Sequence, residues 1–412
     1  MLFRSLFVSS ISLAAVLSPE GVEVKFSFQA QFQTSEDGGA VELADAHAQH
    51  LFGYFQSPSV VSMFKLNSDT LGVAAPKLPL FYSILSDKKT GSVRTISYKT
   101  SGTLLMNKKT AKKLLAQENW TISLPYDLDN YYDENCTDEH YNTFGDFWYF
   151  YDPFRKGCEY LAKAPMGAAV TLKIKEIAQP NDISAGFKAM RADNGNGDLF
   201  EIATINGFSE SSTDKEDDGR VNFEALNEWL VKQGFTMKVL AKFETRPVLE
   251  FTKLVKTDEG KTINFRIVRL LAETGVGTKN VTFAKFFKNA MERSDVVVYN
   301  GHSGLGGNLD IPSIEEKSGE IQFNPKKRQL FFFDSCSSYS YYLYPFEQKK
   351  SKGKIDIITQ GLQSYFWTEV PSLQALLKHL LNVNSNPMWS EVLHSMEAPL
   401  EGNTQLLNVG SI

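Results

Sequence analysis

The C-terminal half of the sequence predicts an α/β fold, a mostly parallel sheet flanked by helices, and a β-rich N-terminal domain precedes it. From about residue 196, strand-like segments alternate with amphipathic helical segments, which implies crossovers between parallel strands. Several of these strands, such as VVVY and LFFF, are apolar at every position, as is typical of strands buried on both faces. Before residue 190, apolar and polar residues alternate between turns of Gly, Ser and Asn.

The chain has 412 residues, more than one typical domain, so we expect two domains. We place the β-rich accessory domain at residues 19–195 and the α/β domain at residues 196–412. The formal net charge is −5, whereas nucleic-acid binding normally requires a basic face. We therefore expect no nucleic-acid partner.

The N-terminus carries an apolar run from Leu6 to Leu17 after Arg4. This run has the length of the apolar part of a signal peptide and is too short to span a bilayer. We expect residues 1–18 to be a signal peptide and the protein to be exported to the periplasm, the cell surface or the medium. No small-residue cleavage site follows the run, so an N-terminal core strand or a retained anchor are the alternatives. No later segment is long and apolar enough to predict a transmembrane helix in the mature chain.

Residues 20–190 read as strands, among them 21–32 and 92–106, interrupted by helical patterns at 41–55 and 108–120. A long aromatic segment, 127–160, contains Cys136 and Cys158. The third cysteine is Cys336, and an odd count in an exported protein leaves one thiol over. We expect a disulfide between Cys136 and Cys158, with three unpaired thiols as the alternative.

The C-terminal elements follow in a regular order. The expected strands are 199–207, 235–243, a hairpin within 246–271, then 295–300, 329–334 and 354–362, and the expected helices are 222–233, 282–294, 372–382 and 388–396. Asn222 has a side chain suited to cap the first helix, and Gly234 follows its end.

Two reactive side chains follow two of the apolar strands. His302 comes directly after 295–300, and Cys336 comes directly after 329–334. Functional groups in open α/β sheets gather at the carboxyl ends of strands, and an imidazole can activate a thiol for attack on a carbonyl. If the two strands are neighbours, both side chains reach one cleft, and Gly301 allows close backbone approach beside it. Asp334 would line the floor of that cleft, ready to hold a cation.

The motifs YNGHSG (299–304) and DSCSS (334–338) resemble the paired His-Gly and Asp-Ser-Cys motifs of caspase-like (clan CD) cysteine peptidases. The closest motifs are those of metacaspases and clostripain-like enzymes. The order of elements from about 199 to 360 is also similar. The resemblance covers the C-terminal half and leaves the first 190 residues unexplained.

The resemblance implies a peptidase that acts on protein or peptide substrates, with Cys336 as nucleophile and His302 as general base and acid. It implies that the N–H of Cys336 and one beside His302 bind the oxyanion. Ser303 stands where the family usually has glycine, and its Cβ restricts the backbone geometry at this position. In relatives with an acid two residues before the cysteine, that acid selects Arg or Lys at P1, which assigns this role to Asp334. Asp356 on the next strand is the nearby candidate for a second acid in that pocket.

Two other functions stay open on the sequence alone. One is a catalytically inactive caspase-like binding protein, and the other is a secreted calcium-dependent adhesion protein. The peptidase function that the resemblance implies requires no cofactor. Calcium is a possible ligand, because Asp214, Glu216 and Asp218 fall at the first, third and fifth ligand positions of a calcium loop. Position 12 of that loop is Ala225, so an acidic connector capped by Asn222 is the favoured interpretation.

Overall fold

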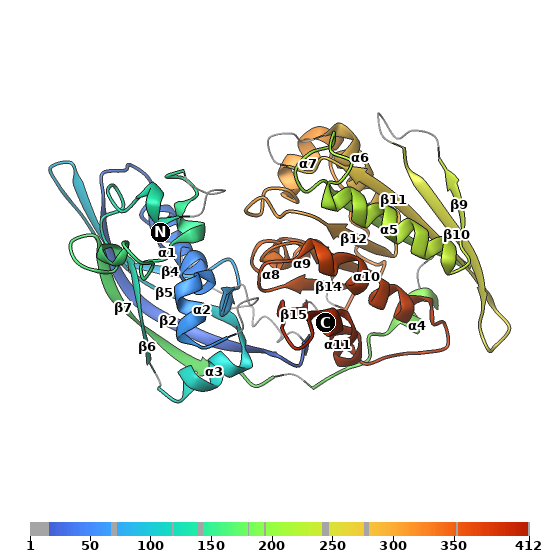
Figure 1. The fold of residues 1–412 in the computed structure, drawn as a ribbon, viewed down its shortest axis with the longest axis horizontal. Coiled ribbons are helices and arrows are strands. Elements are labelled where there is room, and N and C mark those ends of the chain that lie inside the picture. The colour runs from blue at the N-terminus through green and yellow to red at the C-terminus, as the bar shows by residue number, and fades with distance from the viewer. Residues whose placement is uncertain are drawn as a thin grey trace, which may run out of the picture.

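The computed structural model describes residues 16–410 except 67–71, 118, 138–142, 180, 193–194, 241–246, 276–279 and 352. Figure 1 shows two lobes side by side, an N-terminal lobe built from residues 21–176 and a C-terminal lobe built mainly from residues 185–410. Residues 1–15, where most of the expected signal peptide falls, lie outside the described residues. Val16 and Leu17, which we placed near its end, form a strand of the C-terminal sheet. Among the described residues, no helix combines the length and apolar character needed to cross a membrane.

The C-terminal lobe contains a nine-stranded sheet in the order β1-β15-β14-β13-β12-β8-β11-β10-β9. The strands are β1 (Val16–Leu17), β8 (Leu199–Gly207), β9 (Thr236–Val239), β10 (Leu249–Lys256), β11 (Thr262–Ala272), β12 (Val296–Asn300), β13 (Gln329–Asp334), β14 (Ile355–Gln360) and β15 (Leu407–Gly410). The central strands β11, β8, β12, β13 and β14 run parallel, whereas β1 and β15 at one edge and β9 and β10 at the other pair antiparallel. The expected α/β class is confirmed, and the sheet is mixed rather than mostly parallel.

Helices cover both faces of this sheet. One face carries α4 (Phe187–Ala192), α5 (Asp218–Lys232), α10 (Phe366–Leu381) and α11 (Trp389–Glu397), and the other carries α6 (Val281–Arg293), α7 (Ile311–Ser318), α8 (Ser338–Tyr341) and α9 (Leu343–Glu347). In β13, Leu330 and Phe332 pack on the first group while Phe331 and Phe333 pack on the second. The all-apolar strands are therefore buried on both faces, as their composition predicts.

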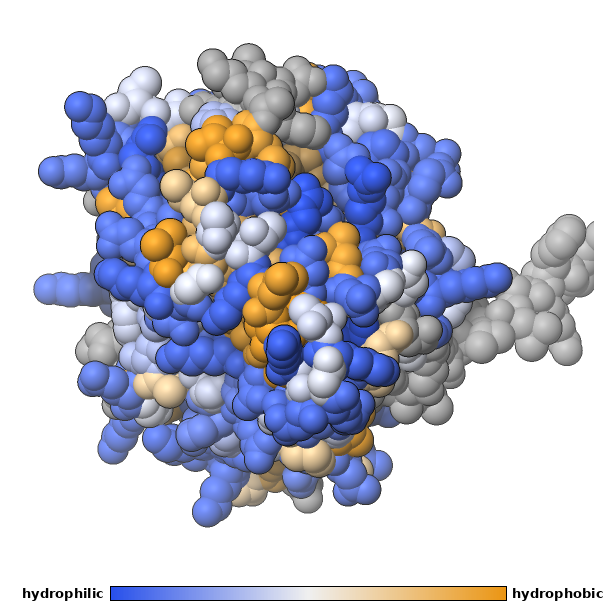
Figure 2. Space-filling view, turned by 90° about the vertical axis from the view of Figure 1, so that its right-hand side faces the viewer, coloured by the Kyte–Doolittle hydropathy of each residue, from blue (hydrophilic) through white to orange (hydrophobic). Residues whose placement is uncertain are grey.

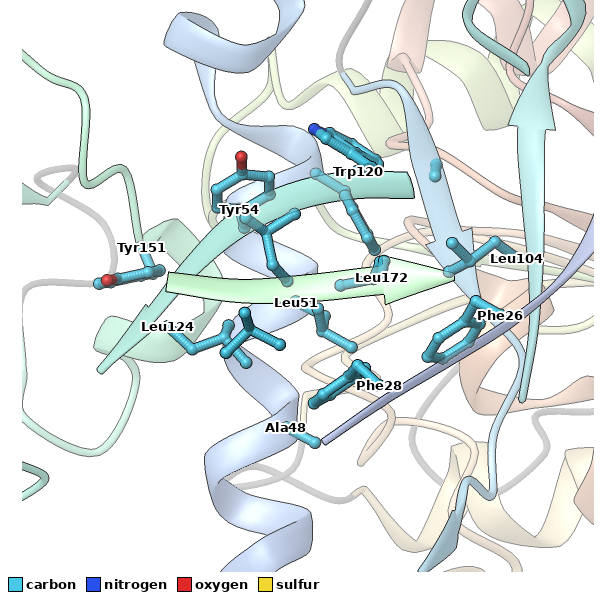
Figure 3. Packing of buried hydrophobic residues seen from close by; sticks show 14 of the residues in the cluster. Phe26, Phe28, Ala48, Leu51, Tyr54, Leu104, Trp120, Leu124, Tyr151 and Leu172 are labelled. Atoms are coloured by element: carbon cyan, nitrogen blue, oxygen red, sulfur yellow. The ribbon is translucent and has the colours of Figure 1, made fainter. Parts of the chain in front are cut away.

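The N-terminal lobe contains an antiparallel sheet in the order β3-β5-β2-β7-β6, with β4 paired to β5. Its strands are β2 (Gly21–Thr34), β3 (Ala74–Pro76), β4 (Phe81–Thr90), β5 (Val93–Asn107), β6 (Asn119–Pro125) and β7 (Gly167–Glu176), and its helices are α1 (Ala40–Gln56), α2 (Pro58–Met63) and α3 (Lys108–Leu115). Alternate residues of β2, including Phe26 and Phe28, face α1 and meet Ala48 and Leu51 in a separate hydrophobic core (Figure 3). This lobe is thus an α-helix packed on a twisted sheet.

The boundary between the lobes lies before α4. Ala185, Phe187 and Met190 pack in the hydrophobic core of the C-terminal lobe, so this segment belongs there and not to the accessory domain that we placed at 19–195. In the aromatic segment of the N-terminal lobe, a disulfide joins Cys136 to Cys158 with a Cα–Cα distance of 5.7 Å. Figure 2 views the C-terminal lobe from its side farthest from the N-terminal lobe, where hydrophobic groups are interspersed among hydrophilic ones.

Candidate functional site

His302 and Cys336 follow neighbouring parallel strands. Strand β12 pairs with β13, and Asn300 is aligned with Asp334. Each reactive residue lies two positions beyond this pair, at the carboxyl edge of the sheet, where neighbouring strands are about 4.8 Å apart. The N–H of Gly301 donates to the carbonyl of Asp334 at 3.1 Å, which carries the alignment past the strand ends. Both residues also contact one segment, because Ser364 bonds the thiol and the Phe366 ring lies 5.3 Å from the imidazole.

The imidazole of His302 is exposed and oriented by a backbone carbonyl. Its Nε2 lies 2.8 Å from the carbonyl oxygen of Ser209. Since a carbonyl oxygen only accepts, Nε2 carries the hydrogen, and in the neutral ring Nδ1 is the basic nitrogen. The backbone carbonyl of His302 accepts hydrogen bonds from Tyr299 Oη and Asn308 Nδ2, each at 2.7 Å. The main chain and the ring are therefore both held in place.

Asp217 organises the loop that presents the Ser209 carbonyl. Its carboxylate accepts hydrogen bonds from the N–H and hydroxyl of Ser209, and from the N–H groups of Glu210, Ser211 and Arg220. Burial alone would raise the pKa of Asp217, but these donors outweigh it and bring the pKa down to about 2. Asp217 is also the N-cap of α5, so one buried carboxylate links the start of this helix to the loop behind His302.

Cys336 is half-buried and is not bonded to another cysteine. Burial raises the pKa of this thiol above its ordinary value, and Asp334 raises it further. The N–H and hydroxyl of Ser364 act in the opposite direction, because they donate to the sulfur. A thiol with a raised pKa needs a base to become a nucleophile at neutral pH, and His302 is the imidazole at this edge.

Gly301 and Ser303 shape the backbone beside His302. A side chain at Gly301 would lie 3.3 Å from the backbone of Gly207 on β8, and its φ of 152° also favours glycine. Ser303 is buried, and its carbonyl accepts hydrogen bonds from the Tyr342 hydroxyl and from two backbone N–H groups. Ser303 therefore lies in a well-bonded turn.

Asp334 shares the interior beneath the site with a second acid, Glu369 of α10. Asp334 accepts hydrogen bonds from Asn300 Nδ2 and from the side chain of Gln360, and burial raises its pKa to about 7. Burial also raises the pKa of Glu369 well above its usual range, and the charge of Asp334 adds to this shift. Asn222 donates to Glu369 at 3.0 Å. No ion pair joins Asp334 or Glu369 to a lysine or arginine in the described part of the chain.

Asp356 is not part of this site, contrary to the expectation. It is aligned with Leu330 at the start of β13, four residues along the strand from the level of Asp334. Its carboxylate pairs with Arg328 at 2.9 Å. Gln360, which follows Asp356 by four residues on the same face of β14, is the residue beside Asp334.

Asp214, Glu216 and Asp218 do not converge into a calcium site. In the described ranges, no group of three or more His, Cys, Asp or Glu side chains is arranged to hold a metal ion. The helix begins at Asp218 and is capped by Asp217, not by Asn222 as we expected. Gly219 is needed for packing, because a Cβ at this position would lie 1.9 Å from the carbonyl oxygen of Gly207.

The site also involves four residues from distant segments that we did not expect there, namely Ser209, Asp217, Ser364 and Glu369. Asp217 had a recognisable signal, since an aspartate before a helical pattern is a good N-cap. Glu369 had none, because a glutamate in a helix is usually exposed.

No protein-family model matches the chain, and a search of curated proteins returns no significant match. The function is therefore argued from the geometry of the site.

Proposed function

We propose that the protein is an exported cysteine endopeptidase of the caspase-like type, in which Cys336 and His302 form the catalytic dyad. The observation that carries this proposal is the alignment of Asn300 with Asp334 on neighbouring parallel strands, which sets the two residues at the same edge. The Cys136–Cys158 disulfide supports export, because disulfides persist in oxidising compartments.

In the proposed reaction, Nδ1 of His302 accepts the thiol proton of Cys336, and the thiolate attacks the carbonyl carbon of the scissile peptide bond. The carbonyl oxygen becomes an oxyanion, for which the N–H groups of Cys336 and Ser303 are the proposed donors. The C–N bond then breaks, and the imidazolium returns its proton to the leaving amine. Water, deprotonated by His302, hydrolyses the thioester and regenerates the thiol.

The proposed P1 residue is Arg or Lys. Two buried carboxyl groups, Asp334 and Glu369, lie beneath the site, and a cationic side chain would supply the positive charge that neither has in an ion pair. A desolvated carboxylate discriminates strongly, because a neutral side chain would leave it without a partner. Glu369 replaces Asp356 as the proposed second acid.

Peptide amides with Arg, Lys, Asn, Asp or Ala at P1 test the proposal with wild-type protein, Cys336→Ala and His302→Ala. We expect hydrolysis after Arg and Lys by the wild type alone, unaffected by a calcium chelator. Hydrolysis that survives Cys336→Ala would remove Cys336 from the mechanism, and a preference for Asp would refute the role of Asp334.

The raised pKa of the Cys336 thiol favours one second candidate, a caspase-like binding protein without turnover. Such a protein would bind peptides that contain Arg or Lys without cleaving them. Calorimetry with the uncleaved peptides distinguishes it from the peptidase.

A further inference from the structure

The segment that follows Cys336 is held by the N-terminal lobe. In Figure 1, α8 and α9 lie on the side of the C-terminal lobe that faces the N-terminal lobe. The Tyr339 hydroxyl donates to Glu23 at 2.7 Å, and the Ser340 hydroxyl donates to the carbonyl of Pro76 at 2.6 Å. The ring of Tyr341 stacks on Phe52 of α1 with a centroid distance of 5.6 Å. These contacts reach three consecutive residues of the turn behind the nucleophile.

Ser337, the residue directly after Cys336, adopts a left-handed conformation with a φ of 52°. This conformation is unfavourable for a residue with a Cβ, and it persists only where surrounding contacts impose it. The N–H of Ser337 donates to the carbonyl of Leu362 at 3.0 Å. Its hydroxyl oxygen accepts a hydrogen bond from Nε2 of Gln56 at 3.1 Å.

Gln56 reaches both segments that flank the thiol. Its Nε2 donates to Ser337, and its Oε1 accepts a hydrogen bond from Gln363 at 3.5 Å. Gln363 precedes Ser364, which donates to the sulfur of Cys336. One buried amide from the N-terminal lobe therefore joins the turn after the nucleophile to the segment that bonds its sulfur.

The fold places Gln56 tightly. It is the last residue of α1, and the next residue, Ser57, is the N-cap of α2. Gly72 lies against it, because a Cβ on Gly72 would lie 3.1 Å from both Gln56 Cγ and Leu362. Ala75 and Leu105 of the N-terminal lobe also belong to the hydrophobic core that contains Tyr339 and Leu362. The interface is therefore packed like a protein interior around this amide.

We propose that Gln56 is a positioning residue for Cys336, because its amide joins Ser337 to Gln363 on the two sides of the nucleophile. This inference rests on the proposed peptidase function. It assigns the N-terminal lobe to the catalytic unit itself. Changes in the position of α1 would then alter the reactivity of Cys336.

The test compares Gln56→Leu with Gln49→Leu, which changes the same residue type on the same helix away from the interface. The side chain of Gln49 donates to Asp45 of the same helix at 3.4 Å. We expect Gln56→Leu to lower kcat about tenfold or more, with KM within about twofold, because small misplacements of a nucleophile slow the chemical step. Gln49→Leu should retain wild-type kcat.

Alkylation by iodoacetamide supplies a readout that does not depend on turnover. Cys136 and Cys158 are in a disulfide, so the reagent reports on Cys336. We expect Gln56→Leu to be alkylated about threefold faster than wild type, since a released turn exposes the thiol. Faster alkylation together with slower hydrolysis is the signature of lost positioning rather than of general damage.

Ser337→Ala removes the acceptor of the same hydrogen bond, and it serves if Gln56→Leu fails to fold. The double variant should be no slower than the slower single variant, because both changes remove one interaction. Wild-type alkylation and kcat in Gln56→Leu or Ser337→Ala would overturn the proposal. If the wild type hydrolyses no peptide yet Gln56→Leu alkylates faster, the peptidase proposal fails alone and the positioning role stands.

Discussion

At the scale of single residues, the buried acids Asp334 and Glu369 would link substrate charge to pH in the proposed peptidase. A buried carboxyl without a cationic partner is more stable in its neutral form, which is why the pKa of Asp334 is raised to about 7. A cationic side chain would stabilise the ionised form instead. The proposed P1 site would therefore select for charge only when the acid has ionised.

Asp334→Asn tests this relation. Between the ordinary pKa of 3.8 and about 7, the folded state binds more protons at Asp334 than the unfolded state does. The wild type should therefore lose stability as pH rises through this window, by a few kcal/mol at about 1.4 kcal/mol per pKa unit. Asp334→Asn should reduce that slope, measured by urea unfolding at several pH values.

Agmatine, an arginine-like cation, should raise the Tm of the wild type at pH 8 and not that of Asp334→Asn. Equal stabilisation of both proteins would contradict the assignment of Asp334 to the pocket.

Asp217 acts on the site through Ser209. Its pKa is depressed to about 2, so its contribution to stability is complete above 3.8 and is lost as pH falls through 2. At pH 7, Asp217→Asn should cost about 2 kcal/mol of unfolding free energy. It should also lower kcat with little change in KM, because the Ser209 carbonyl would no longer orient His302. Asp214→Asn, in the exposed part of the same loop, should change neither quantity.

At the scale of elements, the start of α5 is fixed by contact with the end of β8. Gly219 of the helix and the carbonyl of Gly207 are too close for any Cβ between them. Gly219→Ala should therefore displace the first turn of α5, together with Asp217, and destabilise the fold by about 1–3 kcal/mol. Thermal unfolding measures this effect. Gly145→Ala, at an open and exposed position, is the control, and an equal effect of both changes would contradict the prediction.

The same element shows how far the sequence can predict this structure. The helix pattern at 222–233 was recognisable, but its first turn was not, because Asp217 and Gly219 resemble part of a calcium loop as well as a capped helix start. The strands that carry His302 and Cys336 were predictable, since continuous apolar runs occur where helices cover both faces. Their pairing was not, because neighbours in a sheet are decided by tertiary packing.

The contribution of residues from distant segments could not be predicted from the sequence either. Glu369 and Gln56 are ordinary polar residues of helices, and only the packing of α10 on α5 and of α1 on the 337–341 turn makes them neighbours of the site. Asp356 illustrates the converse. It is on the expected strand and face, but its position along β14 places it with Arg328 at the opposite end.

At the scale of the whole molecule, the first described residues belong to the C-terminal lobe, and the chain then forms the N-terminal lobe. Val16 and Leu17 pair with β15, and the N–H of Ser18 donates to the carbonyl of Leu407 at 2.9 Å. The chain then enters β2 of the N-terminal lobe and returns to the C-terminal lobe after β7. Two crossings of the interface tie the lobes together, which supports their action as one unit.

In the proposed exported protein, the position of leader cleavage would decide whether the short strand β1 is retained. A mature protein that begins at Pro19 would lack β1 and present the backbone of β15 to solvent, and such unpaired edges recruit strands from other molecules. We expect that protein to self-associate in light scattering and to melt at a lower temperature than one that begins at Val16. Identical behaviour of the two would contradict this expectation. In the proposed exported protein, the choice of a few residues at cleavage would thus determine whether the molecules stay dispersed or polymerise.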